Sequence, residues 1–145
     1  MNGGYVLERC EDAWVNYLTS SMQYSLSGSV SIHKGMDWLD KDGALVVCYA
    51  ENMEEDFPFS GIYHVQMSIH LRYPFEDSGS IEKRNLISQD LHKTMFDNQN
   101  LINSLTGSTT NLGIYAITFG GNSNGFAGDS WVSTTALDIV AVSTN

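Results

Sequence analysis

The stretch from Gly61 to Tyr73 alternates between apolar and polar residues, and it constrains the fold more than any other part of the chain. A period of two is that of a β-strand with one buried face, so we expect a strand here. At about 3.3 Å per residue this strand would span roughly 40 Å, about twice the usual length. Pro74 should end it, because proline has no N–H to donate to a neighbouring strand. The residues on the expected core face are Tyr63, Val65, Met67, Ile69, Leu71 and Tyr73.

The length and composition are those of one compact unit, and a chain of 145 residues predicts a single domain over residues 1–145. With 42% apolar and 17% charged residues, the chain has enough apolar side chains to fold around a core. Its formal net charge of −10 disfavours sequence-independent binding to nucleic acid or to an anionic membrane, because both carry the same sign of charge. We therefore expect no specific nucleic-acid partner and no membrane partner.

The cysteines and the N-terminus both favour a cytoplasmic protein. Cys10 and Cys48 fall in an expected helix and an expected buried strand, which favours free buried thiols over a disulfide. The first residues carry early acidic side chains and no apolar run, unlike a signal peptide. No window approaches the roughly 18 uninterrupted apolar residues of a membrane span.

The remaining segments predict an α+β fold: a mostly antiparallel β-sheet with long strands and helices packed on one face. Apolar spacing predicts a helix from Tyr5 to Met22 and another from a Ser78 or Ser80 cap to Asp97. The packed positions of the second helix would be Ile81, Leu86 or Ile87, Leu91, Met95 and Phe96. The other expected elements are a short strand through Val30 and Ile32, a doubly buried strand over Ala44–Ala50, an acidic loop over Glu51–Asp56, a helical turn over Leu101–Leu105, a strand over Ile114–Phe119, a glycine-rich loop over Gly120–Ser130 and a last strand over Trp131–Val142.

Signatures of catalysis and of metal binding are weak. The run Gly121–Gly125 matches the G-x-S-x-G of serine hydrolases around Ser123, but a nucleophile elbow needs a helix after the serine and a strand is expected there. His64 and His70 share a strand face at a separation of about 20 Å, too far apart to hold one ion. We expect no catalytic residues, no metal and no cofactor.

The acidic loop over Glu51–Asp56 runs directly into Phe57 and Phe59. An ordinary turn and a contact loop fit this run equally well. Long strands, aromatic residues beside loops and a large charge of one sign are together typical of a subunit that meets neighbouring subunits.

Two runs of the sequence resemble the tail-terminator and neck proteins of tailed bacteriophages. The first is ALVVCYAENMEEDFPFSGIYHVQMSIHLR, in which an apolar strand leads through an acidic turn into a long alternating strand. The second is GIYAITFGGNSNGFAGDSWVSTTALDIVAV, a strand, a polar loop with glycines and a closing strand. With the helix between them the resemblance covers roughly residues 44–142, and the first forty residues match nothing in it.

The resemblance implies an α+β virion structural protein, assembled in the cytoplasm of a bacterial host. Such proteins form a homo-hexameric ring that caps the tail tube, stops its polymerisation and joins the tail to the head connector or stopper protein, with a sheath as a further neighbour in contractile tails. DNA passes through the lumen of the ring, and a negative lumen would not hold it. On this resemblance the channel-facing residues would be Glu51, Glu54, Glu55 and Asp56, and the interface residues would be Phe57, Phe59, Tyr63, Gly120, Asn122, Asn124 and Phe126.

Other functions stay open at this point. A head-tail stopper or a tail-completion protein would differ from a tail terminator in its partner rather than in its fold. A small hydrolase would use Ser123, and a cellular adaptor domain would have no viral role.

Overall fold

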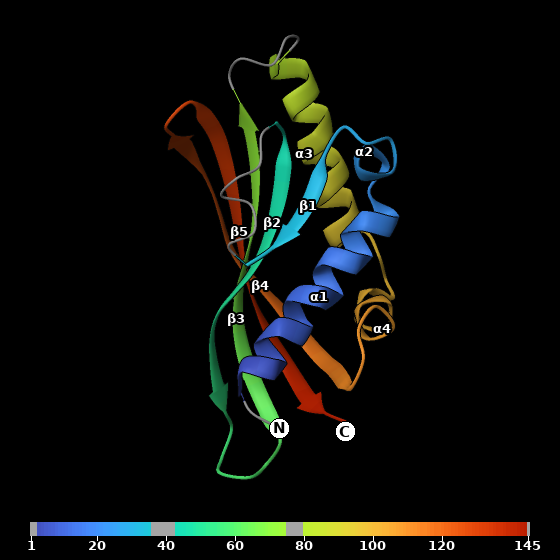
Figure 1. The fold of residues 1–145 in the computed structure, drawn as a ribbon, viewed down its shortest axis with the longest axis vertical. Helices are drawn as coiled ribbons and strands as arrows, with labels where there is room; N and C mark the ends of the chain where they lie inside the picture. The colour runs from blue at the N-terminus through green and yellow to red at the C-terminus, as the bar shows by residue number, and fades with distance from the viewer. Residues whose placement is uncertain (1–2, 36–42, 75–79, 145) are drawn as a thin grey trace.

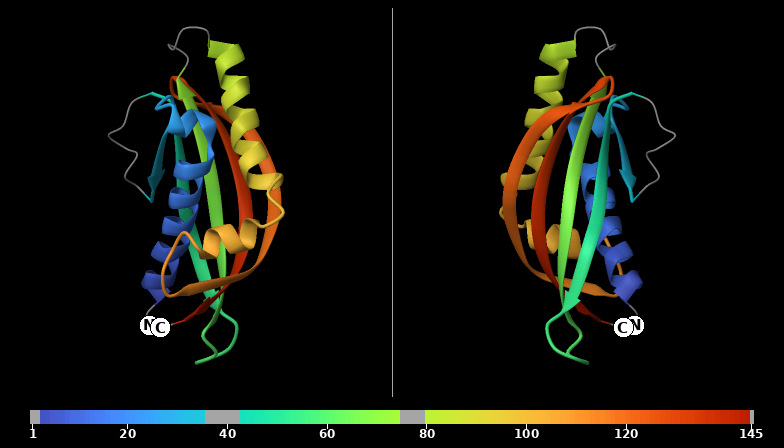
Figure 2. Two further views of the ribbon diagram at one scale, coloured as in Figure 1. Left: turned by 90° about the vertical axis from the view of Figure 1, so that its right-hand side faces the viewer. Right: turned by 90° about the vertical axis from the view of Figure 1, so that its left-hand side faces the viewer.

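The computed structural model describes residues 3–35, 43–74 and 80–144, so Ser78 lies outside the described residues. These residues form a five-stranded sheet in the order β1-β2-β3-β5-β4, with β1 and β2 parallel and every other neighbouring pair antiparallel. The helices all lie on one face of this sheet (Figures 1 and 2), which confirms the expected α+β architecture. The strands are β1 (Ser31–Lys34), β2 (Leu45–Glu55), β3 (Ile62–Pro74), β4 (Leu112–Ala127) and β5 (Ser130–Ser143), and the helices are α1 (Gly3–Ser21), α2 (Gln23–Leu26), α3 (Ser80–Phe96) and α4 (Leu101–Thr106).

The central strand β3 confirms the alternation read from the sequence. It ends at Pro74, and it pairs with β5 from Ile62 to Pro74 and with β2 on its other side. Its core-facing residues are Tyr63, Val65, Met67, Ile69, Leu71 and Tyr73, and all six are buried. Both neighbours satisfy its main-chain groups, so β3 forms the rigid centre of the sheet.

The helices cover the core face of the sheet through the spacing that the sequence predicts. In α1 the side chains of Val6, Cys10, Trp14 and Leu18 are fully buried at intervals of three to four residues. Cys10 and Cys48 are both buried and free, as expected. Burial raises the pKa of the Cys10 thiol to about 12, so it stays protonated at neutral pH.

The packed face of α3 is narrower than expected. Ile87, Leu91 and Met95 are buried, but Ile81, Leu86 and Phe96 are exposed. Of the expected packed positions, only Ile87, Leu91 and Met95, which are spaced four residues apart, pack in the core. Three large apolar side chains of this helix therefore contribute to the protein surface.

Two expected loops are strands in the structure. The acidic stretch Glu51–Glu55 continues β2, with a register shift between Ala50 and Asn52, and the turn to β3 follows it. Most of the glycine-rich stretch belongs to β4, which pairs with β5 up to Ala127. Cross-strand pairing outweighs the weak strand propensity of acids and glycines, because a long neighbouring strand offers partners for their main-chain groups.

Replacing Ile69 with alanine should lower the free energy of unfolding by about 2–5 kcal/mol, because the substitution leaves a cavity at a buried position of β3. Chemical denaturation measures this change. Gln66→Ala, on the exposed face of the same strand, is the matched control and should change stability by less than about 0.5 kcal/mol. Equal losses in the two variants would contradict a one-sided core at β3.

Candidate interaction surfaces

The expected interface residues lie at different levels of the sheet: Phe57 and Phe59 at one end, Phe126 near the other, and Gly120 and Asn122 close to the middle. Ile62 pairs with Val142 at one end of β3, and Pro74 pairs with Ser130 at the other, so the β2–β3 and β4–β5 turns are about 40 Å apart. Figure 1 shows the first turn at the bottom, beyond the helices, and the second at the upper left. Within one copy, the residues at these two turns therefore cannot form one site.

The residues at these ends differ in exposure. Phe57 and Phe59 are 60% and 99% exposed at the β2–β3 turn, and Phe126 is 75% exposed beside the β4–β5 turn. Gly120, Asn122 and Asn124 lie in β4 rather than in a loop. Tyr63 is 8% exposed, because its position in the alternation of β3 turns it toward the core, so it presents little surface for a contact.

The β2–β3 turn, hereafter the hairpin tip (residues 56–61), is stabilised by the side chain of Glu55, the last residue of β2. The Glu55 carboxylate accepts hydrogen bonds from the main-chain N–H of Phe59, at 3.3 Å, and of Gly61, at 3.2 Å. Phe59 has φ = 64°, in the left-handed region that costs a residue with a side chain roughly 1–2 kcal/mol. Glu55 thus stabilises the turn, and its expected place beside the channel stays a prediction.

The other three acids expected to face the channel lie on the sheet face that points away from the helices. Glu51 accepts a hydrogen bond from the hydroxyl of Ser68, and Asp56 pairs with His64 at 3.0 Å. Glu54 and Asp56 share a shallow cavity of about 540 Å³ with Asp138 of β5. We call Glu51, Glu54, Asp56 and Asp138 the acidic face.

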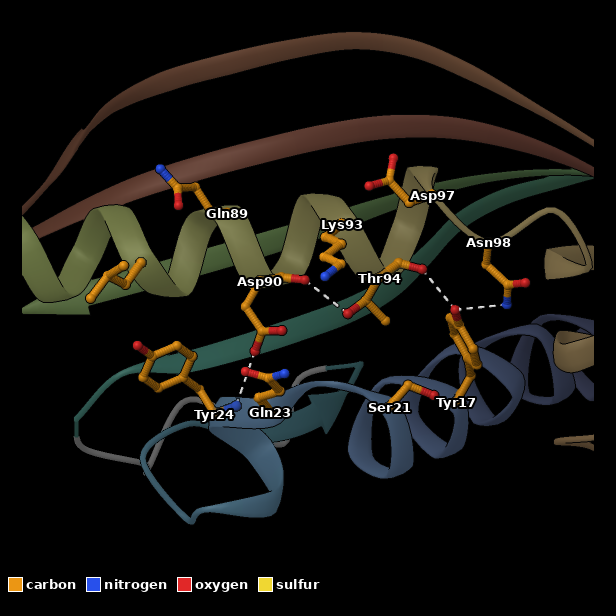
Figure 3. Close-up of a pocket in the computed structure, with 11 residues that line it drawn as sticks. Tyr17, Ser21, Gln23, Tyr24, Gln89, Asp90, Lys93, Thr94, Asp97 and Asn98 are labelled. Atoms are coloured by element: carbon orange, nitrogen blue, oxygen red, sulfur yellow. Dashed lines mark hydrogen bonds between the residues drawn. The ribbon is translucent and has the colours of Figure 1, made fainter.

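A polar groove of about 560 Å³ runs between α1–α2 and α3 (Figure 3). Asp90 accepts a hydrogen bond from the main-chain N–H of Tyr24 at 3.0 Å. The Tyr17 hydroxyl donates to the carbonyl of Thr94 at 2.7 Å and accepts from the Asn98 amide at 3.0 Å. These groups bind one another across the groove, so they hold the helices together.

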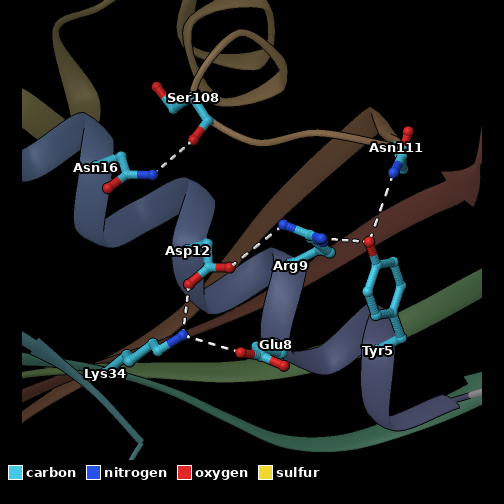
Figure 4. Close-up of polar contacts among 8 residues, drawn as sticks. All are labelled: Tyr5, Glu8, Arg9, Asp12, Asn16, Lys34, Ser108 and Asn111. Carbon is cyan, nitrogen blue, oxygen red and sulfur yellow. Dashed lines mark hydrogen bonds and ion pairs between the residues drawn. The ribbon is translucent and has the colours of Figure 1, made fainter.

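The outer side of α1 carries a cluster of ion pairs (Figure 4). Lys34 of β1 lies 2.7 Å from Asp12 and 3.1 Å from Glu8, and Arg9 lies 3.9 Å from Asp12. The hydrogen bond that the Lys34 ammonium donates to Asp12 is the main cause that raises the pKa of Lys34. The cluster ties α1 to β1 and uses two of the few cations of the chain.

The structure gives the G-x-S-x-G sequence no elbow geometry. Ser123 lies within β4, opposite Thr134 of β5, and strand residues follow it where an elbow has a helix. Among the described residues, no group of three or more His, Cys, Asp or Glu side chains is arranged to hold a metal ion. Within the same residues, no helix has the length and apolar character needed to cross a membrane.

Sequence comparisons find no protein-family model that matches this chain and no curated protein that matches it.

Replacing Glu55 with alanine should lower the free energy of unfolding by about 1 kcal/mol, because two N–H groups of the hairpin tip lose their acceptor. Glu54→Ala is the matched control and should change stability by less than about 0.5 kcal/mol, because Glu54 is exposed on the acidic face. Thermal unfolding of the two variants compares them. An equal effect of the two changes would show that Glu55 does not stabilise the turn.

Replacing Tyr17 with phenylalanine should cost about 1 kcal/mol of stability, because the part-buried hydrogen bond to the carbonyl of Thr94 is lost. Tyr115→Phe, which removes a hydroxyl from an exposed ring, should leave the unfolding midpoint unchanged. Urea titrations of both variants give the difference. A neutral Tyr17→Phe variant would mean that water replaces the lost bond.

Proposed function

We propose that this chain is a virion structural protein of the neck of a tailed bacteriophage, and that it acts as the tail terminator. In this role six copies form a ring on the end of the tail tube, stop its growth and present the surface that meets the head connector or stopper protein. The resemblance of residues 44–72 and 113–142 to that family supports the proposal. In the fold, these two runs form the β2–β3 hairpin and the β4–β5 hairpin.

The observation that carries the proposal is Phe59. Its side chain is 99% exposed, its main chain is in the left-handed region, and it sits at the end of a hairpin that projects beyond the helices (Figure 2). An exposed aromatic residue in a costly conformation gives the isolated chain no stability, so its value lies in a contact with another molecule. The end of a long hairpin is suited to reach into an adjacent ring of the tail tube.

The acidic face supports the same role through its charge. Its carboxylates lie on the face of the sheet that points away from the helices, within a chain whose formal net charge is −10. A ring that turned this face inward would have a lumen that repels the phosphates of a passing genome and does not hold them. The helices would then lie on the outside of the ring.

A head-tail stopper or tail-completion protein remains the alternative within the virion. It differs from a tail terminator in the molecule that Phe59 contacts. A tail terminator binds the tube protein through the hairpin tip, whereas a stopper would bind the connector. Pull-down of the wild-type chain with purified tail tubes separates these two roles, because only the tail terminator binds the tube through the hairpin tip.

Replacing Phe59 with glycine should abolish binding to tail tubes without loss of stability, because glycine adopts the left-handed conformation freely. The measurements are co-sedimentation with tubes and infectivity of a phage that carries only the variant gene. Leu26→Ser is the matched control, because it removes another exposed apolar side chain, 68% exposed, from α2. Normal tube binding and normal infectivity of Phe59→Gly would contradict the proposed contact.

Light scattering and negative-stain imaging of the purified chain test the ring itself. Rings of six with a central hole are expected. A chain that stayed monomeric both free and on tail tubes would contradict the tail-terminator role and would leave the adaptor and Ser123 hydrolase functions to be tested by the activity of a Ser123→Ala variant.

A further inference from the structure

The outer edge of β4 has no strand beside it in the described part of the chain. β4 is the last strand in the sheet order and pairs with β5 alone, and the Thr106 hydroxyl accepts a hydrogen bond from the Ile114 N–H on its open side. Beyond Ile114, this edge continues along the rest of a 16-residue strand. An edge of this length offers a row of main-chain donors and acceptors to another strand.

The sequence of β4 does not protect this edge. Residues 112–127 contain no charged residue and no proline, which are the common devices that stop edge strands from pairing with other chains. Two register shifts bend the strand, one between Ile114 and Ala116 and one between Phe119 and Asn122. Between them Ala116–Phe119 is a regular run that can accept a partner.

A cavity with one apolar wall lies beside this regular run, on the helix side of the sheet. It measures about 550 Å³; its apolar wall is Met95, Phe96, Leu101, Ile102, Ile117 and Phe119, and its polar lining is Asn98, Gln99, Asn100 and Asn103. Phe96 stacks edge-on against Phe119 with ring centroids 4.5 Å apart, yet 48% of its surface stays exposed. A strand added along Ala116–Phe119 would direct alternate side chains over the cavity, as in other cases of strand addition.

We propose that the partner strand is the acidic half of β2, residues 51–55, from a second copy of this chain. β1 pairs with β2 only from Leu45 to Cys48, so no described strand lies beside the rest of β2. On that open side the Met53 N–H bonds to the side-chain oxygen of Asn52, at 2.8 Å. The inference rests on the ring proposed above, and it assigns the contact between neighbours in that ring.

The direction of the strands fits this contact. β2, β3, β5 and β4 follow one another through three antiparallel pairings, so β4 runs opposite to β2. Two copies that stand side by side in the same orientation therefore bring β4 of one copy antiparallel to β2 of the next. A contact between two different edges repeats from copy to copy and can close into a ring.

The height of the two edges along the sheet also fits. Asn52 and Thr118 lie at the same level, because Asn52 pairs with Gln66, Gln66 with Asp138 and Asp138 with Thr118. The register shifts of β2 and β4 also begin at one level. Ala50 pairs with Met67, Met67 with Leu137 and Leu137 with Phe119. The open half of β2 thus faces the regular run of β4 in the next copy.

Charge selects this pairing over a contact between two β2 edges. Glu51, Glu54 and Glu55 of one copy would oppose those of the other in such a contact, whereas β4 brings no charge. In the β4–β2 pairing Met53 falls on the helix side of the sheet, where it already packs at the margin of its own core. Its thioether would lie beside the aromatic wall of the neighbouring cavity, a favourable sulfur–aromatic contact.

Engineered cysteines test the contact directly. Thr118→Cys combined with Asn52→Cys, or with Glu54→Cys to allow a shift of two residues, should form disulfides between neighbouring copies on mild oxidation. Within one copy these positions are separated by two strands, about 14 Å, so they cannot form a disulfide with each other. A ladder of covalent oligomers on a non-reducing gel is the expected result, and the native cysteines are buried and do not compete.

The single variants are the matched controls, and each outcome decides a separate question. Covalent dimers from Thr118→Cys alone would mean that β4 pairs with β4 and would overturn the proposal. Rings without covalent ladders in either double variant would also overturn it, while leaving the tail-terminator role untouched. Covalent ladders from a chain that does not bind tail tubes would support the β4–β2 contact and contradict the proposed function. Thermal unfolding of each variant confirms that it is folded.

Discussion

The pairing of β3 with both neighbours, along its whole length with β5 and from Tyr63 to Arg72 with β2, is the interaction on which the rest of the structure depends. β3 provides the core side chains against which the helices pack, and its hydrogen bonds align β2 on one side and β5 on the other. Because the strand has 13 residues, the turns at its two ends are far apart. The distance between the hairpin tip and the β4–β5 turn is therefore a direct consequence of one long alternating segment.

The acids of this chain serve different purposes in different places. Glu8 and Asp12 balance Lys34, and Glu55 holds the hairpin tip. Glu11 is half-buried and accepts the Ala50 N–H at the point where β1 ends, and burial raises its pKa. Four further acids, Glu51, Glu54, Asp56 and Asp138, share the sheet face away from the helices, and this acidic face is what makes a negative lumen geometrically reasonable.

The periodic segments could be predicted from the sequence, and the loops could not. The alternation of β3 and the apolar spacing of α1 each report a single buried face, and both were confirmed. The stretch from Gly120 to Ala127 was expected to be a loop because glycine and asparagine favour turns, yet pairing with β5 holds it as a strand. The hydrogen bonds of Glu55 to the hairpin tip could not be predicted, because the geometry of the turn decides what its carboxylate contacts, whereas the burial of Tyr63 follows from the alternation of β3.

The sequence by itself determined the secondary structure of the strongly patterned segments, the free state of the two cysteines, the α+β class and the negative charge. These properties depend on local periodicity and on composition, which are complete in the linear chain. Only the tertiary structure decided which acids share a face, that the two aromatic ends lie apart, and that β4 is an uncharged open edge. Those relations arise between segments distant in sequence, and hydrogen bonding across the sheet is the physical step that creates them.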